Sequence, residues 1–453
     1  MAKPKGERFE RDLQYYKFCA YGFLKDLRFF DPFMILMFLD KGLSYAQIGS
    51  LYALREVLIN VMEIPSGVMA DALGRRRTMI ASFAAYLASF VVFYLARGYA
   101  VLLLAMGVFA FGDAFRTGTH KAMIFDYLKL KGWADQKTHY YGHTRSWSQR
   151  GAALSSLIAA ALVIWHGEYR VVFLFTLIPY ALDLILMLSY PASLDGPRSA
   201  AYRAAIAGSG ASAAAGPVAP AASEGADAHA ASRSVAEEFR HVIKAFASSF
   251  KDLFVLKAIS NQALYTGYYK AAKDYLQPLL AGLALGLPVL LSWHEQERTA
   301  LVVGLVYFVL YLATSYASRS SGRVSERFPS LARPLNLTLL AGLGLGLASG
   351  LSYGLGLTAL SALLYTGIYV IENLRKPMGI AYVSELMNQD ALATALSAES
   401  QAETLFAALV SLGLGFAADA LGPGMGLAVV SGACLCLGFL LRLPESREAV
   451  SRP

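Results

Sequence analysis

Charged side chains are scarce in this sequence. They make up 16% of its 453 residues, whereas hydrophobic residues make up 56%. A soluble domain needs a charged and polar surface, and about a quarter of its residues are typically charged. The composition therefore excludes an ordinary soluble protein and predicts that most of the chain lies in an apolar environment.

The sequence also has few cysteines and lacks recognisable catalytic motifs. The three cysteines, Cys19, Cys434 and Cys436, lie in apolar stretches, and none has a metal-ligand spacing to a histidine. We expect them to pack as small apolar side chains without a metal. The sequence also lacks a nucleophile–base constellation and a phosphate-binding glycine loop, so we expect neither an enzyme nor a bound cofactor.

The chain contains instead a series of long apolar runs. Each is about 18 to 25 residues long, the length that a helix needs to cross the hydrocarbon core of a bilayer. Backbone polar groups in lipid must bond within the protein, and continuous runs fit helices rather than the alternating strands of a barrel. The pattern predicts an all-α integral membrane protein. The expected helices cover residues 17–40, 44–66, 77–97, 100–126, 146–165 and 171–190, then 257–282, 299–317, 335–353, 356–380, 391–416 and 424–442.

Positive charge is concentrated in alternate loops. The net charge of +8 could indicate nucleic acid binding, but the loop asymmetry follows the positive-inside rule of membrane proteins. It predicts a multi-pass protein in the inner membrane of a bacterium, with both termini in the cytoplasm and no nucleic acid partner. The basic N-terminal segment lacks the apolar core and cleavage site of a signal peptide, so we expect the first helix to be retained.

A polar interruption at residues 191–256 separates the two halves of the chain. Residues 197–232 are rich in Ala, Gly, Ser and Pro, a composition that predicts a flexible linker. Residues 234–256 instead repeat apolar side chains such as Val235, Phe239 and Phe246 at helical spacing, opposite a charged face. They predict an amphipathic helix that lies on the inner leaflet or packs on a soluble partner.

A loop rich in glycine and arginine follows the second expected helix. It reads Gly67-Val-Met-Ala-Asp71-Ala-Leu-Gly74-Arg75-Arg76-Arg77. Gly67 would allow close helix packing and Gly74 a tight turn, while Asp71 can accept hydrogen bonds from amides at a helix N-terminus. The loop resembles the signature loop of the major facilitator superfamily. Gly67, Asp71, Gly74, Arg75 and Arg76 are in register, and Ala72 replaces a residue that is usually basic.

The resemblance covers essentially the whole chain. It implies the superfamily's fold of twelve transmembrane helices, with pseudo-symmetric six-helix bundles at residues 1–190 and 257–453 and a cytoplasmic linker at 191–256. Two departures bear on the subclass. Val108 and Phe111 stand where the fourth helix would carry the Arg and Gln of an Arg-x-x-Gln-Gly pattern, and the fifth helix lacks the Gly-Pro pattern of drug–proton antiporters. Both departures weigh against a multidrug exporter.

Ionisable residues recur within the apolar runs. A charged side chain near the bilayer centre costs at least about 2.5 kcal/mol on insertion, so it usually faces a partner or a water-filled path. Several pairs, including Lys270–Asp274, Arg28–Asp31 and Asp113–Arg116, have the intrahelical spacing to neutralise each other. In the superfamily arrangement most of these charges fall on helices that line the central cavity. The resemblance therefore implies a wet, bipolar cavity that is rich in tyrosine.

Such a cavity suits a small polar solute that carries negative or zwitterionic charge. Basic side chains would bind its anionic group and tyrosines would stack on or hydrogen-bond the rest, unless they serve as ion-pair partners and interhelical packing. The candidate substrate-binding residues are Arg28, Arg55, Arg116, Lys270, Tyr265, Tyr268 and Tyr269. Coupling to protons requires a carboxyl group whose protonation changes as the cavity changes sides. The candidates are Asp31, Glu56, Asp113, Glu372 and Glu399.

Three functions are consistent with the sequence. The first is transport of a small polar, anionic or zwitterionic solute by alternating access, coupled to protons as symport or antiport. The second is proton-driven export of drugs or other amphipathic compounds. The third is a membrane sensor or scaffold that uses the same fold without transport and docks a partner through residues 191–256. We expect a monomer in each case.

Overall fold

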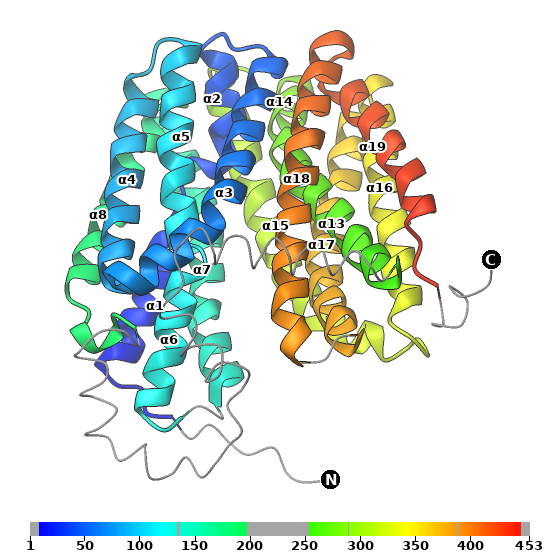
Figure 1. Ribbon diagram of the computed structural model, residues 1–453. Coiled ribbons are helices and arrows are strands. Elements are labelled where there is room, and N and C mark those ends of the chain that lie inside the picture. The colour runs from blue at the N-terminus through cyan, green and yellow to red at the C-terminus, as the bar shows by residue number, and fades with distance from the viewer. Residues whose placement is uncertain (1–8, 134–135, 197–252, 289, 387–388, 445–453) are drawn as a thin grey trace.

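The computed structural model describes residues 9–133, 136–196, 253–288, 290–386 and 389–444. Regular structure in these residues is entirely helical (Figure 1), as the apolar runs predict. The predicted linker at 197–232 and most of the predicted amphipathic helix at 234–256 lie outside the described residues. The last residues of that segment belong to α13, which covers Leu253–Ala272 and so begins before the expected span at 257.

The first six passes form one bundle with an aromatic core. The first pass consists of α1 (Leu13–Lys25), a 3₁₀ turn (Asp31–Phe33) and α2 (Met34–Asp40). The others are α3 (Tyr45–Leu73), α4 (Arg75–Leu95), α5 (Tyr99–Arg116) with α6 (Thr119–Leu130), α7 (Lys137–His166) and α8 (Val171–Leu188). In the core, Phe30 stacks on Phe173 and contacts the rings of Phe90 and Phe109.

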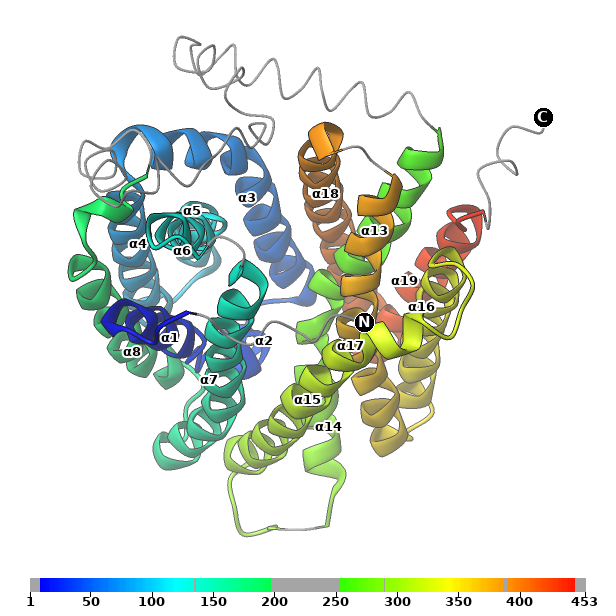
Figure 2. The ribbon, with the colours of Figure 1, turned by 90° about the horizontal axis from the view of Figure 1, so that it is seen from below.

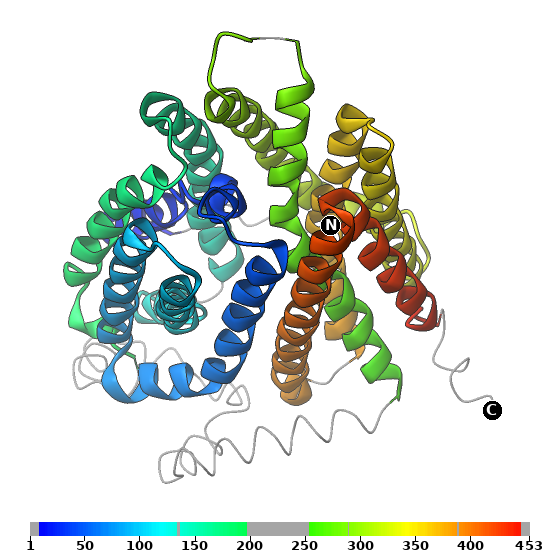
Figure 3. The same ribbon diagram turned by 90° about the horizontal axis from the view of Figure 1, so that it is seen from above.

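The remaining passes form a second bundle beside the first, as the two end views show (Figures 2 and 3). Its first pass consists of α13, a 3₁₀ turn (Lys273–Tyr275) and α14 (Leu276–Gly286). The others are α15 (Glu295–Ser325), α16 (Ala332–Gly354), α17 (Thr358–Leu386), α18 (Gln389–Leu421) and α19 (Pro423–Leu440). The two bundles confirm the predicted division into six and six.

Three helices that the sequence predicts as continuous are broken. Pro32 lies in the 3₁₀ turn between α1 and α2, and Pro278 follows the turn between α13 and α14. Proline has no amide hydrogen to donate to the carbonyl four residues earlier, and this loss favours a break. Gly118 separates α5 from α6 with a φ of +83°, a conformation that glycine adopts easily. The predictions of unbroken helices at 17–40, 100–126 and 257–282 are therefore wrong.

The outer surface of the molecule is apolar. Leu104, Ile178, Val309, Leu363 and Leu409 are all exposed on the helices, whereas many of the charged side chains lie in the interior, either between the bundles or inside one of them. Eight helical segments among the described residues are long and apolar enough to cross a membrane. The four passes that fall short, namely α1–α2, α3, α13–α14 and α17, are broken or carry ionisable residues. The polar side chains of these passes need to face the interior of the protein and not lipid.

The bundles contact each other along α3 and α18, through hydrogen bonds of Asn60 and Glu63 with Gln401 and through a close approach at one end. We call this end the α2–α3 face (top of Figure 1) and the opposite end the α3–α4 face. Near the α2–α3 face, a Cβ atom at Gly49 of α3 would lie 2.4 Å from the carbonyl oxygen of Ser411 of α18. The Asp419 carboxylate of α18 accepts hydrogen bonds from the Tyr45 and Ala46 amides at 2.6 and 2.9 Å, and so caps α3. The two bundles are therefore joined at this face.

Gln277 makes a second connection, where the first and seventh passes are broken. Its side-chain amide donates to the carbonyl of Asp31 at 2.8 Å and accepts from the amide of Ile35 at 2.8 Å. Gln277 is fully buried at the start of α14, and both partners belong to the broken first pass. The two broken passes are thus tied together across the bundle boundary.

Candidate functional site

A cavity of about 740 Å³ lies between the bundles, toward the α3–α4 face. Lys121 and Lys376 are exposed at its rim, on α6 and α17 respectively. Its charged lining residues are Lys25, Asp26, Arg116, Lys121 and Arg145 on the first bundle and Lys376, Glu399 and Glu403 on the second. Positive charge therefore predominates on the first wall and negative charge on the second.

A smaller cavity of about 220 Å³ lies deeper between the bundles, where the two 3₁₀ turns interrupt the first and seventh passes. Asp31 and Asp274 belong to these turns, and both line the cavity. Asp31 lies 3.9 Å from Arg28, and Asp274 lies 3.5 Å from Lys273. Because Asp26 lines both cavities, the two spaces are adjacent.

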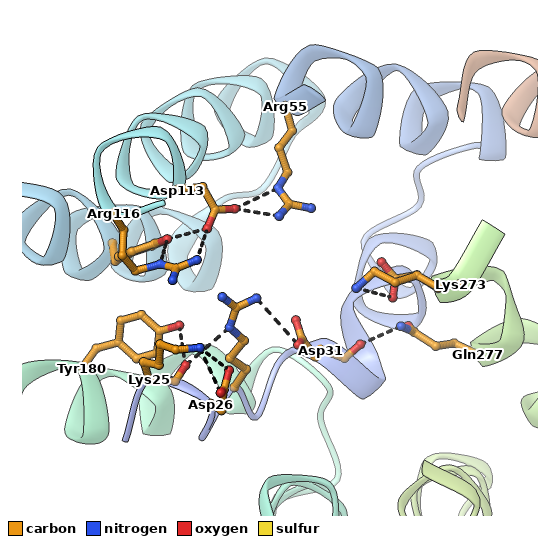
Figure 4. A network of polar contacts seen from close by, with 12 residues as sticks. Lys25, Asp26, Asp31, Arg55, Asp113, Arg116, Tyr180, Lys273 and Gln277 are labelled. Carbon is orange, nitrogen blue, oxygen red and sulfur yellow. Dashed lines mark hydrogen bonds and ion pairs between the residues drawn. The ribbon is translucent and has the colours of Figure 1, made fainter. Parts of the chain in front are cut away.

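Asp113 is the centre of a buried ion network in the first bundle (Figure 4). Its carboxylate accepts hydrogen bonds from Arg55 of α3 at 2.6 Å and from Arg116 of its own helix at 3.3 Å. The Tyr86 hydroxyl of α4 also donates to Asp113, and Arg116 donates to that hydroxyl at 2.9 Å. The network joins three helices. Arg116 is the residue of the network that lines the larger cavity.

Only some of the predicted substrate-binding residues line a cavity. Arg116 lines the larger one, and Arg28 and Tyr269 line the smaller one. Arg55 does not line either cavity in the described structure, because it is bound to Asp113 and lies over the Phe109 ring. Lys270 also lies off the linings, but it forms an ion pair of 3.1 Å with Glu403 of the larger cavity. It therefore pairs between helices, not with Asp274 of its own pass.

Two predicted tyrosine contacts are corrected by the structure. Tyr265 is fully buried and donates to the Ile368 carbonyl at 3.1 Å, while the Tyr268 hydroxyl lies 2.7 Å from the Ser431 hydroxyl. Both rings occupy space beside glycines of α16, where a Cβ at Gly342 or Gly346 would overlap their hydroxyls. These two tyrosines are interhelical packing residues and do not line either cavity.

The predicted proton-coupling carboxyls lie in different environments. Asp31 lines the smaller cavity and Glu399 the larger one. Glu56 is buried 3.8 Å from Arg55, and Glu372 is buried with Thr266 donating at 3.4 Å. These two and Asp113 lie off both linings among the described residues. One oxygen of Glu399, Oε2, is buried without a hydrogen-bond partner in the described structure.

The signature loop forms the turn between α3 and α4. Gly74 has a φ of +98°, which confirms the predicted turn. Arg75 forms an ion pair with Asp126 of α6, and Arg76 donates to the Tyr190 carbonyl at 2.9 Å. The predicted close packing at Gly67 is wrong, because a Cβ there would meet nothing within 4 Å in the described structure. The Asp71 side chain lies outside the described part of the structure.

Several residues of the cavity lining and of the signature-loop contacts were not among the sequence-based candidates. Asp195, after α8, accepts a hydrogen bond from the Arg76 amide at the start of α4 at 2.9 Å. The sequence offers no signal for this contact, because Asp195 follows an unremarkable turn. Lys25, Asp26 and Glu403 could have been found, because each is an ionisable residue inside or beside an apolar run.

The fold and its sequence together define a class of membrane transporter. The sequence model of the Major Facilitator Superfamily matches residues 22–417, and the chain belongs to this superfamily. Over 90 residues it is 31% identical to an uncharacterized MFS-type transporter, YxaM, of Bacillus subtilis (strain 168). That alignment covers 20% of this chain and 23% of the relative.

Solved transporters share the fold along nearly the whole chain. The nucleoside transporter NupG superimposes with a TM-score of 0.70 at 11% identity, over 95% of this chain and 98% of NupG. A POT family transporter in complex with 5-aminolevulinic acid superimposes with a TM-score of 0.66 at 15% identity, over 97% of each chain. The chain is thus a multi-pass transporter with two six-helix bundles, and its cavities lie between them.

Proposed function

We propose that this transporter moves a small polar solute with zwitterionic or anionic charge by alternating access, coupled to protons. The observation that carries the proposal is the separation of charge across the larger cavity. Arg116, Lys121 and Arg145 lie on the first bundle, and Glu399 and Glu403 lie on the second. A solute with a carboxylate at one end and an ammonium group at the other complements both walls.

Among the described residues of the negative wall, Glu399 is the carboxylate that is available to a ligand. Glu403 is already paired with Lys270 at 3.1 Å. Glu399 is buried, and its Oε2 has no hydrogen-bond partner among the described residues. A buried carboxylate without a partner is costly, and an ammonium group or a proton would lower that cost. Glu399 is therefore our candidate both for the cationic end of the solute and for the coupled proton.

The positive wall offers Arg116 for the anionic end. Its guanidinium is held by Asp113 and the Tyr86 hydroxyl, so its position is fixed before a solute arrives. A guanidinium binds carboxylates with two parallel hydrogen bonds, and a fixed orientation lowers the entropy cost of forming them. The POT family neighbour was solved with 5-aminolevulinic acid, which is itself a zwitterion. This agrees with the proposed solute class.

The contacts between the bundles support a transport cycle. Asp419 and the Gly49–Ser411 approach join them at the α2–α3 face, and Gln277 joins them beside the smaller cavity, whereas the larger cavity lies toward the α3–α4 face. Rocking of one bundle against the other would open the first end and close the second. The signature loop with the Arg75–Asp126 ion pair lies at the end that would then close.

A thermal-shift screen of the purified protein tests the solute class. We would compare 5-aminolevulinic acid, dialanine, uridine and the lipophilic cation tetraphenylphosphonium, each at acidic and neutral pH. A solute at a hundredfold excess over its Kd should add about 2.7 kcal/mol to the free energy of unfolding. Stabilisation by the zwitterions supports the proposal. Stabilisation by tetraphenylphosphonium alone would favour an exporter of amphipathic compounds instead.

The variant Glu399→Gln tests the role of the negative wall. The amide keeps the shape of the side chain and removes its charge, so we expect at least a tenfold higher Kd for a stabilising zwitterion, or about 1.4 kcal/mol. Isothermal titration would measure it. The control is Glu168→Gln, which changes an exposed carboxylate that pairs with Arg170 at 2.6 Å far from the cavities. An equal Kd in both variants would remove Glu399 from the binding site.

A further inference from the structure

Asp183 of α8 lies in the interior of the first bundle, behind the cavity wall. Its exposed fraction is 0%, and neither carboxylate oxygen has a hydrogen-bond partner among the described residues. The helix α8 packs against α1, α4 and α7, and Asp183 lines neither cavity. An ionised carboxylate in such a place costs several kcal/mol. Its neutral, protonated form is therefore the form that fits this site.

The face of α8 that carries Asp183 is turned toward α1. Tyr180 lies three residues before Asp183, so both share one side of the helix. The Tyr180 hydroxyl donates to the Lys25 carbonyl at 3.1 Å, and Figure 4 shows Tyr180 beside Lys25. The charged residues that act on Asp183 are Lys25 and Asp26 at the end of α1 and Arg116 of α5. Lys25 is the residue that the Tyr180 contact places on this side of α8.

Lys25 is bound to a second carboxylate on its other side. Its ammonium group donates to both oxygens of Asp26, at 3.0 and 2.9 Å. Their side chains are 20% and 19% exposed, and both residues line the larger cavity. Asp26 lies in the segment between α1 and the first 3₁₀ turn, where no helix fixes the backbone. One lysine therefore interacts with a buried acid and with an acid on the cavity wall.

We propose that Asp183 stores a proton that it exchanges with Asp26 when Lys25 changes its ion-pair partner. In the described conformation Asp183 is a neutral acid, and the Lys25 ammonium pairs with the Asp26 carboxylate. When the segment after α1 moves, the ammonium group pairs with Asp183 instead. The O–H bond of Asp183 breaks, and the same proton forms an O–H bond on Asp26, directly or through water.

This exchange conserves charge and delivers the proton to the solute pathway. One ammonium group, one carboxylate and one neutral acid are present before and after it. Asp26 lines both cavities, so its proton can leave to either of them. The inference rests on the proposed function only for the place of this step in a transport cycle. The protonation of Asp183 itself is a property of the protein without solute.

Infrared spectroscopy of the full-length protein in lipid tests the inference without a substrate. A protonated carboxylic acid has a carbonyl stretch that is distinct from that of a carboxylate. We expect Asp183→Asn to lose one such band that the unmodified protein shows at neutral pH. Asp26→Asn should lose the same band, because Lys25 then has only Asp183 as its partner. The control Asp40→Asn, an exposed carboxylate at the end of α2, should keep it.

Each outcome of this experiment decides one step. An unchanged band in Asp183→Asn would overturn the assignment of the stored proton. A band that persists in Asp26→Asn would overturn the exchange of partners at Lys25. Size-exclusion profiles and thermal unfolding show which variants are folded, and spectra are compared only among those. Asp183→Glu keeps an acid at this position and should retain a band, shifted in frequency, which separates loss of the acid from misfolding.

Discussion

Asp113 belongs to an ion network that joins three helices. Its replacement would leave two arginines without a carboxylate partner. Arg55 and Arg116 would then be two positive charges in the interior of the first bundle. Removing one member of a buried ion pair costs more stability than replacing every charged member of it by apolar residues. We predict that Asp113→Asn lowers the free energy of unfolding by about 3 kcal/mol. Equilibrium unfolding in detergent measures the change.

A surface pair provides the comparison for Asp113. Glu168 and Arg170 are 51% and 45% exposed, and their charges stay solvated when the pair is broken. Glu168→Gln should change the free energy of unfolding by less than about 0.5 kcal/mol. If Asp113→Asn were equally mild, the buried network would be a solvated part of the pathway and not a structural connection.

The residues of the candidate site were only partly predictable. The sequence shows which side chains are too polar for lipid, and Arg28, Arg116, Asp31 and Glu399 do line the cavities. The sequence does not show which helix packs against each of these side chains. Tyr265 and Tyr268 occupy space beside glycines of α16, and Lys270 pairs with Glu403 of α18. Such contacts depend on the rotation of distant helices about their own axes.

At the scale of elements, the glycine contact between α3 and α18 lets the bundles meet. A Cβ at Gly49 would lie 2.4 Å from the Ser411 carbonyl oxygen, too close for any atom. We predict that Gly49→Ala pushes the helices apart and destabilises the closed α2–α3 face by about 1 to 3 kcal/mol. The measurement is maleimide labelling of a cysteine introduced at Thr314, which lines the smaller cavity, with the native cysteines replaced by serine.

Gly344→Ala is the matched control, because a Cβ at Gly344 of α16 would meet nothing within 4 Å in the described structure. Reagent added from the α2–α3 side should label Thr314→Cys faster in Gly49→Ala than in the control. Equal rates would mean that this contact does not hold the face closed.

The positions of the helices were more predictable than their breaks. Length and hydropathy place the ends of every pass within nine residues of the observed ends, because the bilayer sets how much apolar chain a pass needs. The breaks at Pro32, Gly118 and Pro278 were missed, although these residue types are present in the sequence. Proline also occurs inside several unbroken helices, including α3, which contains Pro65. The presence of a proline therefore does not by itself predict where a helix breaks.

At the scale of the whole molecule, closure of the larger cavity should bring its rims together. Thr117 at the end of α5 and Ile380 of α17 are exposed lining residues on opposite bundles. We predict that spin labels at these two positions report a shorter distance when a stabilising solute binds, because the solute attracts both charged walls. Double electron–electron resonance measures the distance distribution. An unchanged distribution with a bound solute would contradict rocking of the bundles.

The four passes that are broken or carry ionisable residues have a consequence for biosynthesis. A nascent helix enters the bilayer alone only if its own transfer from the translocon is favourable, and ionisable residues oppose that transfer. The passes α1–α2 and α3 come first in the chain, before the apolar helices α4 and α5–α6 are made. We expect them to wait beside the translocon until Asp113 of α5 arrives to pair with Arg55 of α3. The order of synthesis would then make the ion network of the finished transporter a checkpoint of its assembly.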